Sequence, residues 1–146
     1  MSPIFLFGGV DHLVFSEIVI TPSEAEFVKI TNPTANDIGL TNYYLTDGTD
    51  ISNGKFYYQL TGGLNYWSGS GSDFICRFPL GYTLSAGTSV TISLRDSSTY
   101  ANYFGENADL TLADDLLDAV DGISTKGSNA AKLGNSAETL ILFYWD

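Results

Sequence analysis

The stretch EFVKITNPTANDIGLTNYYLTDG, residues 26–48, contains the strongest fold signal in this sequence. At its start Val28 and Ile30 alternate with Phe, Lys and Thr, the two-residue period of a strand whose two faces differ. The run NPTAND at residues 32–37 then collects turn formers, because proline cannot continue a strand ladder and Asn and Asp tolerate tight turns. An apolar run resumes over residues 38–45. We therefore predict strand, turn and strand, which is a scaffold signal and not an active-site signal.

The composition indicates one all-β domain. A chain of 146 residues is long enough for a real core and is most simply a single domain. Nine Tyr and nine Phe favour strands, and 15 Gly among short apolar runs provide many turns. These features predict a β-sandwich. We expect its strands at residues 13–20, 26–31, 55–60, 74–78, 90–94 and 138–146. The first two of these should form an antiparallel hairpin.

Two short helices are expected in the loops. Residues 97–104 predict the first, with Ser97 or Ser98 as its N-cap and Gly105 as its end. The second should cover residues 107–121, where four apolar residues fall on one helical stripe.

The charge balance excludes some function classes. The formal net charge is −11, from 17 acidic residues against six Lys and Arg, so a duplex-binding groove and adhesion to anionic lipid are not expected. The acidity suits solubility in a salty or extracellular setting, and divalent-cation binding is the alternative interpretation. Cys76 is the only cysteine, so no intrachain disulfide forms, and its apolar surroundings predict a buried thiol. No apolar run approaches a membrane-spanning length, so membrane insertion is not expected.

The two ends of the sequence suggest an excised domain. We interpret residues 1–12 as a leader or linker remnant, with a short edge strand at residues 4–7 as the alternative. The segment lacks the basic start and cleavage site of a signal peptide. Residues 13–146 form the predicted domain, and its ending straight after an apolar strand suggests a piece of a larger protein.

Five motifs in order resemble the lamin tail domain family, an immunoglobulin-like β-sandwich. They are SEI, EFVKITNP, IGLTNYYLTDG, FPLGYTLSAG and LGNSAETL, at residues 16–18, 26–33, 38–48, 78–87 and 133–140. The resemblance spans residues 13–146. Three departures stand out: Lys29 replaces the family's usual second Glu, an insertion at residues 61–72 lengthens a loop, and a further closing strand of the family pattern is absent.

The resemblance implies a non-catalytic module. Bacterial members resemble accessory domains of secreted or cell-surface proteins, and eukaryotic members resemble interaction platforms for proteins and, in some cases, DNA. The acidic charge argues against carrying the DNA role over. We therefore expect an extracellular or cell-surface bacterial module that binds a protein partner or positions an attached domain, and no enzyme. A vacant sheet edge would also allow homodimer formation by strand addition.

The best metal candidate lies in the segment DGTDISNG. Asp47, Asp50 and Asn53 supply oxygen ligands of the kind calcium prefers, on a loop that glycine lets bend tightly. The spacing is not that of an EF-hand, and an Asp/Gly turn between strands looks the same. Calcium is therefore the one cofactor considered, and the alternative is none.

The Gly/Ser-rich insertion carries two aromatic residues, Tyr66 and Trp67. At an exposed loop tip these side chains would suit protein contact or sugar stacking. They support a second function hypothesis, a calcium-assisted domain that binds carbohydrate or a surface. A loop folded back over the end of the sandwich is the structural alternative.

Catalytic arrangements have little support in the sequence. Glu17 and Glu26 lie on strands that can be neighbours, but nothing else indicates a carboxylate pair. His12, Ser16 and Glu17 can be drawn as a triad, but a G-x-S-x-G turn is missing. A second acidic group is most simply the solvated face of the second helix. Its members are Asp114, Asp115, Asp118 and Asp121.

Overall fold

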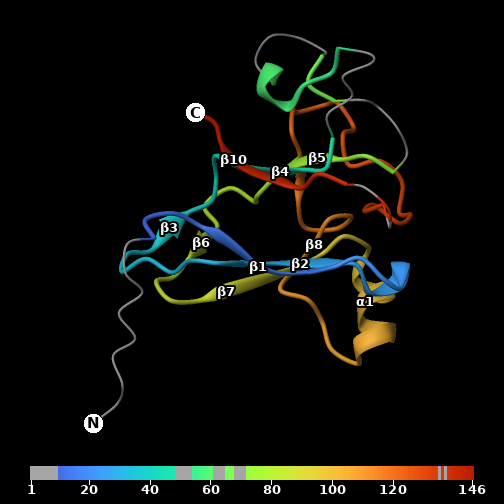
Figure 1. The fold of residues 1–146 in the computed structure, drawn as a ribbon, viewed down its shortest axis with the longest axis horizontal. Coiled ribbons are helices and arrows are strands. Elements are labelled where there is room, and N and C mark those ends of the chain that lie inside the picture. Colours follow the sequence, from blue (N-terminus) through green and yellow to red (C-terminus); the bar gives the residue numbers. More distant parts are fainter. Residues whose placement is uncertain (1–9, 49–53, 61–64, 68–71, 135, 137) are drawn as a thin grey trace.

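The strands on either side of the turn-forming run belong to two different sheets, which lie one above the other in Figure 1. The computed structural model describes residues 10–48, 54–60, 65–67, 72–134, 136 and 138–146. The first sheet has the order β1 (Val14–Val19), β2 (Phe27–Thr31), β7 (Ser89–Ser93) and β8 (Leu110–Thr111). The second has the order β10 (Ile141–Tyr144), β4 (Tyr43–Thr46), β5 (Ile75–Arg77) and β9 (Leu117–Asp118). The architecture is the predicted immunoglobulin-like β-sandwich.

Smaller elements complete the fold. A two-stranded pair, β3 (Ile38–Gly39) with β6 (Thr83–Leu84), links the two layers at one end. The short helical segments are η1 (Ser23–Ala25), η3 (Tyr57–Gln59) and α1 (Ser97–Phe104). Among the described strands β7 and β8 alone pair in parallel, and the other strand pairs are antiparallel.

The main core lies between the sheets and follows the predicted alternation. Val28 and Ile30 of β2 are fully buried, and so are Leu45 of β4 and Cys76 of β5. Each points inward because alternate residues of a strand face the same side. The thiol of Cys76 donates to the carbonyl of Leu45 over 3.4 Å, and burial raises its pKa. The prediction of a buried thiol is confirmed.

The predicted hairpin is formed by β1 and β2, and its register explains why Glu17 and Lys29 pair with each other. The two residues are direct cross-strand partners, and Lys29 Nζ donates to Glu17 Oε2 over 2.9 Å on the exposed face. The lysine that replaces a family glutamate therefore neutralises a neighbouring acid. An exposed pair of this kind contributes up to about 1 kcal/mol.

Helix α1 spans the predicted residues but has a different cap. Asp96, not Ser97 or Ser98, accepts from the backbone N–H of Thr99, and this bond lowers the pKa of Asp96 to about 2. Gly105 ends the helix at φ +75°, a left-handed conformation that favours glycine.

The second predicted helix is wrong. Its residues form β8, a turn and β9, where aspartate side chains accept from backbone amides within this segment and just after it. The N–H of Thr111 donates to Asp115 Oδ2 at 2.8 Å, and the N–H of Thr125 donates to Asp118 Oδ1 at 2.7 Å. These acidic residues are local backbone acceptors and not a solvated helix face.

The strand predicted at residues 55–60 is also wrong. Its aromatic residues enter η3, which lies on the outer surface of the second sheet (Figure 1). High strand propensity alone does not make a strand, because packing and burial on a pleated surface decide the outcome. The predicted edge strand at residues 4–7 lies outside the described residues.

Asn32 holds the turn that joins the two layers. Its side chain is fully buried and donates to the carbonyls of Asn36 at 2.8 Å and Leu84 at 2.9 Å. Its Oδ1 accepts from the N–H of Thr34 at 3.1 Å and from the Thr34 hydroxyl at 2.7 Å. The amide therefore bonds to four polar groups of a partly buried turn, among them the buried carbonyl of Leu84.

We predict that Asn32→Ala lowers the free energy of unfolding by about 3 kcal/mol, because several buried polar groups lose their partner at once. Urea denaturation measures this change. Asn36→Ala is the control, since Asn36 is exposed and bonds through its backbone carbonyl. Equal stability of the two variants would contradict the assigned role.

Candidate functional site

The polar residues of the strongest motif are used by the fold itself. Glu26 is 1% exposed, and its Oε2 accepts from the N–H of Lys132 over 2.7 Å. Burial raises the pKa of Glu26, while the backbone amides of Lys132 and Leu133 and the charge of Arg95 oppose this rise. The carboxylate fastens the loop of residues 124–133 to the start of β2, so it serves as an anchor and not as an acid or base.

The segment Thr46-Asp47-Gly48 fastens β4 to the backbone before β5. Thr46 Oγ1 donates to the carbonyl of Phe74 at 2.7 Å and accepts from the N–H of Gly48 at 3.0 Å. Asp47 Oδ1 accepts from the N–H of Phe74 at 2.8 Å. These three bonds explain why Thr, Asp and Gly occur together at the end of this strand.

The second carboxylate oxygen of Asp47 is buried without a partner among the described residues. Asp47 is 5% exposed, and its Oδ2 makes no hydrogen bond within the described part of the chain. Burial raises the pKa of Asp47 to about 8, opposed by the bond from Phe74 and reinforced by the charges of Asp73 and Glu138. A buried carboxylate oxygen without a partner costs free energy unless a proton or a cation neutralises it.

The rest of the predicted calcium site is not described. Asp50 and Asn53 lie outside the described residues, so the structure does not bring them to Asp47 or separate them from it. Among the residues that are described, no group of three His, Cys, Asp or Glu side chains is arranged to hold a metal ion. Calcium binding by this segment stays a prediction.

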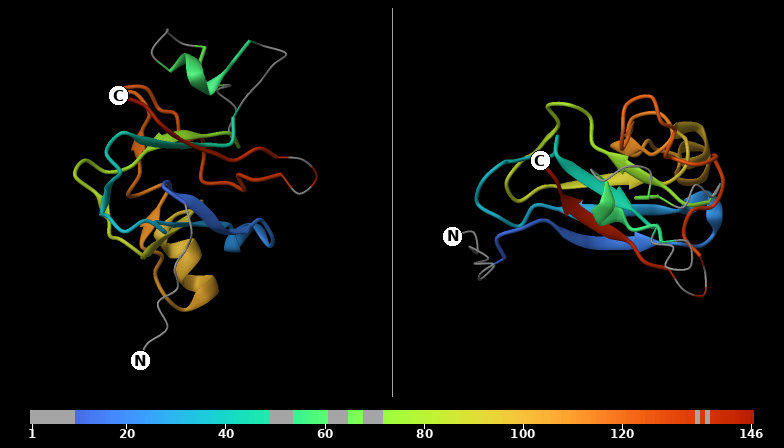
Figure 2. Two further views of the ribbon diagram at one scale, coloured as in Figure 1. Left: turned by 60° about the vertical axis from the view of Figure 1, so that its left-hand side comes forward. Right: turned by 90° about the horizontal axis from the view of Figure 1, so that it is seen from above.

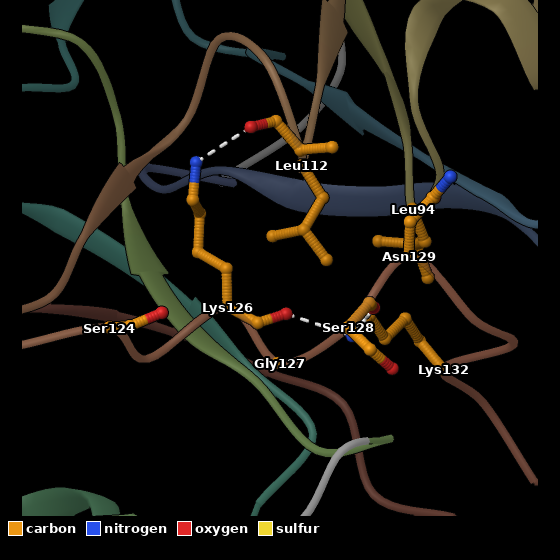
Figure 3. Close-up of a pocket in the computed structure, with 9 residues that line it drawn as sticks. Leu94, Leu112, Ser124, Lys126, Gly127, Ser128, Asn129 and Lys132 are labelled. Atoms are coloured by element: carbon orange, nitrogen blue, oxygen red, sulfur yellow. Dashed lines mark hydrogen bonds between the residues drawn. The ribbon is translucent and has the colours of Figure 1, made fainter.

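A cavity of about 130 Å³ lies beside the loop that Glu26 fastens (Figure 3). Lys126 extends along one side of it and donates to the carbonyls of Ala113 at 2.8 Å and Leu116 at 2.7 Å. Lys132 is 3% exposed and donates to the carbonyls of Lys126 and Ser128 at 2.8 and 2.5 Å. Both ammonium groups therefore bind backbone carbonyls of irregular segments, which is a structural use of the charge.

Tyr66 and Trp67 are not an exposed pair. Tyr66 is 3% exposed and belongs to a second small core, so the expectation of exposure is wrong for it. Trp67 is half-buried, and its Nε1 has no partner in the described residues. Tyr66 and Trp67 pack onto the sheet because large apolar rings gain more by leaving water than a loop tip allows.

The second core covers the outer face of the second sheet. Ile75 of β5 lies at its base and is fully buried. The remaining members come from η3 and the residue that ends it, from the insertion, from the two residues that follow β9, and from β4, β10 and the C-terminal end. They are Leu60, Tyr66, Ala119, Tyr44, Tyr57, Trp67, Val120, Phe143 and Trp145. This sheet is therefore apolar on both faces, which the strand pattern alone did not indicate.

A row of aromatic rings crosses this outer face, and we name it the aromatic ladder. Phe56 stacks on Tyr58 with ring centroids 5.2 Å apart, and Tyr58 meets Tyr57 edge-on at 5.6 Å. Tyr57 contacts Phe143 at 5.0 Å, and Phe143 stacks on Tyr44 at 5.3 Å. Tyr58 is 53% exposed and the other four rings are half-buried, so the ladder forms an apolar surface in contact with solvent.

The catalytic arrangements considered from the sequence do not form. Glu17 is paired with Lys29 on an exposed face, whereas Glu26 is buried against the N–H of Lys132. His12 is exposed and contacts Asp11, its neighbour in the chain.

Two packed sheets, with their polar motif residues bound to backbone, define an immunoglobulin-like β-sandwich scaffold. The family model described as Lamin Tail Domain matches residues 9–144. The chain belongs to this family, whose members are immunoglobulin-like and non-enzymatic domains. A search of curated proteins found no match. No helix within the described ranges is long and apolar enough to cross a membrane.

Asp47 makes a testable contribution to the pH dependence of stability. Its pKa of about 8 in the fold lies above the ordinary value of 3.8, so the folded chain keeps a proton that the unfolded chain releases. The free energy of unfolding should therefore fall as pH rises from about 4 to about 8. Asp47→Asn removes this titration. The slope of the free energy of unfolding against pH should then become smaller by the contribution of about one proton.

Urea midpoints at a series of pH values across this window measure the effect. Asp37→Asn is the matched control, because Asp37 also accepts from a backbone amide, that of Ala86, but is exposed. A pH profile that Asp47→Asn leaves unchanged would show that this carboxyl titrates in its ordinary range.

Proposed function

We propose that this chain is a non-catalytic interaction module of a larger exported bacterial protein, in which it binds a protein partner or positions an attached domain. Residues 13–146 would be the module and residues 1–12 a remnant of a leader or linker. The aromatic ladder is the observation that carries this proposal, and it would be the contact surface. Tyrosine provides a large and rigid contact with one polar end, and for this reason it is enriched at the centres of protein interfaces.

The use of the cations supports a protein partner over a nucleic acid. Phosphate binding needs Lys and Arg side chains that can turn toward the ligand. In this chain every Lys and Arg already donates to an acceptor of the protein itself. These donors are Lys29, Lys55, Arg77, Arg95, Lys126 and Lys132. The net charge of −11 supports a soluble module outside the cell or on its surface.

A photo-crosslinker placed on the ladder tests the proposal. We predict that Tyr58→benzoylphenylalanine gives a discrete crosslinked product in the cells that make the parent protein. Tyr103→benzoylphenylalanine, on α1, should give none. The two positions are matched in exposure, at 53% and 51%. Helix α1 lies on the outer side of the first sheet (Figure 1), whereas the ladder covers the outer face of the second sheet. Equal crosslinking from both positions, or none from Tyr58, would contradict the proposed surface.

A second candidate function is a calcium-assisted domain that binds carbohydrate or a surface. The buried Oδ2 of Asp47 without a partner favours it, because a cation would satisfy this oxygen. Asp50, Asn53 and Trp67 would complete the binding region, and the rings of the ladder would stack on sugars.

Thermal melts distinguish the two candidates. Calcium that binds the folded chain must raise the melting temperature. Once the calcium concentration exceeds several times Kd, the free energy of unfolding should increase by about 1 kcal/mol or more. The calcium candidate predicts a rise that magnesium does not reproduce, that EDTA reverses and that Asp47→Asn removes. No shift with calcium would leave the protein-binding module as the function.

A further inference from the structure

Strand β10 has one free side within the part of the chain that the structure describes. There it is the edge of its sheet and pairs only with β4. The N–H of Trp145 donates to the carbonyl of Asn42, which fixes the direction of the alternation along the strand. Because successive residues of an antiparallel ladder direct their polar groups to opposite sides, the N–H groups of Leu142 and Tyr144 point away from β4. These two residues therefore offer donors and acceptors to a further strand.

The free edge of β10 is short, but it lacks the bulges, charges and prolines that protect many sheet edges. Its sequence, Ile-Leu-Phe-Tyr, has no charge, no proline and no glycine, and its pairing with β4 runs without a bulge. The edge strand of the other sheet differs. Strand β1 has an irregularity between Phe15 and Glu17, and the Glu17–Lys29 ion pair lies beside it. Bulges and charges hinder edge pairing, so β10 and not β1 is the receptive edge.

A groove of about 350 Å³ lies along the same side of the sandwich. Ile18 and Ile20 line it from the first sheet, and Leu133 and Leu140 line it from the segment before β10. Figure 2 shows β1 and β10 running along this side in the view from above. Ile18 is 47% exposed, so an apolar side chain entering the groove would cover apolar surface that now faces water.

The acidic residues around the groove favour a positively charged occupant. Glu138 is the ionisable residue of its lining, and its Oε2 accepts from the N–H of Gly134 at 2.8 Å. Within the described residues Glu138 has no ion pair, and Asp146 follows β10 as a second acid. Two copies of a chain with a net charge of −11 would repel each other. A positively charged segment is attracted, so charge complementarity favours a basic partner over a second copy.

We propose that β10 takes up an extended, basic segment of a protein partner as an additional strand of its sheet. The segment would bond to the backbone of Leu142 and Tyr144, insert an apolar side chain into the groove and bring a Lys or Arg to Glu138. This inference rests on the proposed function and names the chemical class of its partner. Backbone pairing supplies the affinity in this mode of recognition, and the groove and Glu138 supply selectivity.

A defined peptide tests the inference on the whole chain. The probe is a short capped peptide of alternating valine and threonine with lysine at each end. We expect it to bind and to slow amide exchange at Leu142 and Tyr144, as followed by nuclear magnetic resonance. The same peptide with N-methyl groups on alternate amides keeps its charge but cannot pair, so it should not bind. A peptide with glutamate in place of lysine should bind less well, and added salt should weaken the lysine peptide.

Position 144 gives a matched pair of variants. Tyr144→Pro removes the outward N–H and blocks pairing there, whereas Tyr144→Val keeps the N–H. Both lose the exposed ring and its contact with Tyr43, and both keep the ladder to β4. We expect Tyr144→Pro to raise the Kd of the lysine peptide by about tenfold or more, and Tyr144→Val to raise it by less than about twofold. Glu138→Gln should reduce the preference for lysine over glutamate.

The outcomes separate this inference from the proposed function. Failure of the lysine peptide to bind, or equal binding by its N-methylated form, would overturn strand addition. A crosslink from position 58 would then still support the interaction module. A concentration-dependent dimer of the chain alone, abolished by Tyr144→Pro in sedimentation, would overturn the basic partner in favour of self-pairing.

Discussion

Buried backbone N–H and C=O groups must find hydrogen-bond partners, and much of this domain depends on three side chains that supply them. Glu26 receives the loop at Lys132, Asn32 closes the turn between the layers, and Asp47 receives the amide of Phe74. Each lies at the end of a strand, where the regular ladder stops and the chain must change direction. Leaving such an amide without a partner costs about 1–3 kcal/mol, a large fraction of the stability of a small domain. The polar motif residues are therefore explained by folding before any function is considered.

This use of the polar residues changes where function should be sought. An enzyme site keeps reactive groups poised toward a substrate, whereas here the buried carboxylates accept from their own backbone. Fold does not determine function, so surfaces that folding leaves open become the informative ones. The aromatic ladder is one of these surfaces. The free edge of β10 adjoins it, since Phe143 belongs to both the strand and the ladder.

The sequence predicted the sandwich because its main strands carry the alternation that one buried face imposes. Val28 and Ile30 follow this rule, and the hairpin, α1 and the family resemblance are confirmed with them. The second helix was predicted wrongly because Asp115 and Asp118 bind nearby backbone amides, contacts that periodicity cannot detect. Tyr66 was misplaced for a related reason. A loop rich in glycine and serine predicts exposure, but the outer face of β4 and β5 presents apolar side chains that only the folded sheet brings together.

The two cores on either side of the second sheet have a consequence for how the domain opens. The sheet backbone separates them, so the outer core can lose its packing while the inner one keeps its contacts. Units of this kind open at a free energy below that of global unfolding and exchange their amides earlier. The molecule then has a stability gradient, from a stable sandwich interior to a more labile aromatic layer. A partner that contacts this layer would meet a surface able to repack without unfolding the scaffold beneath it.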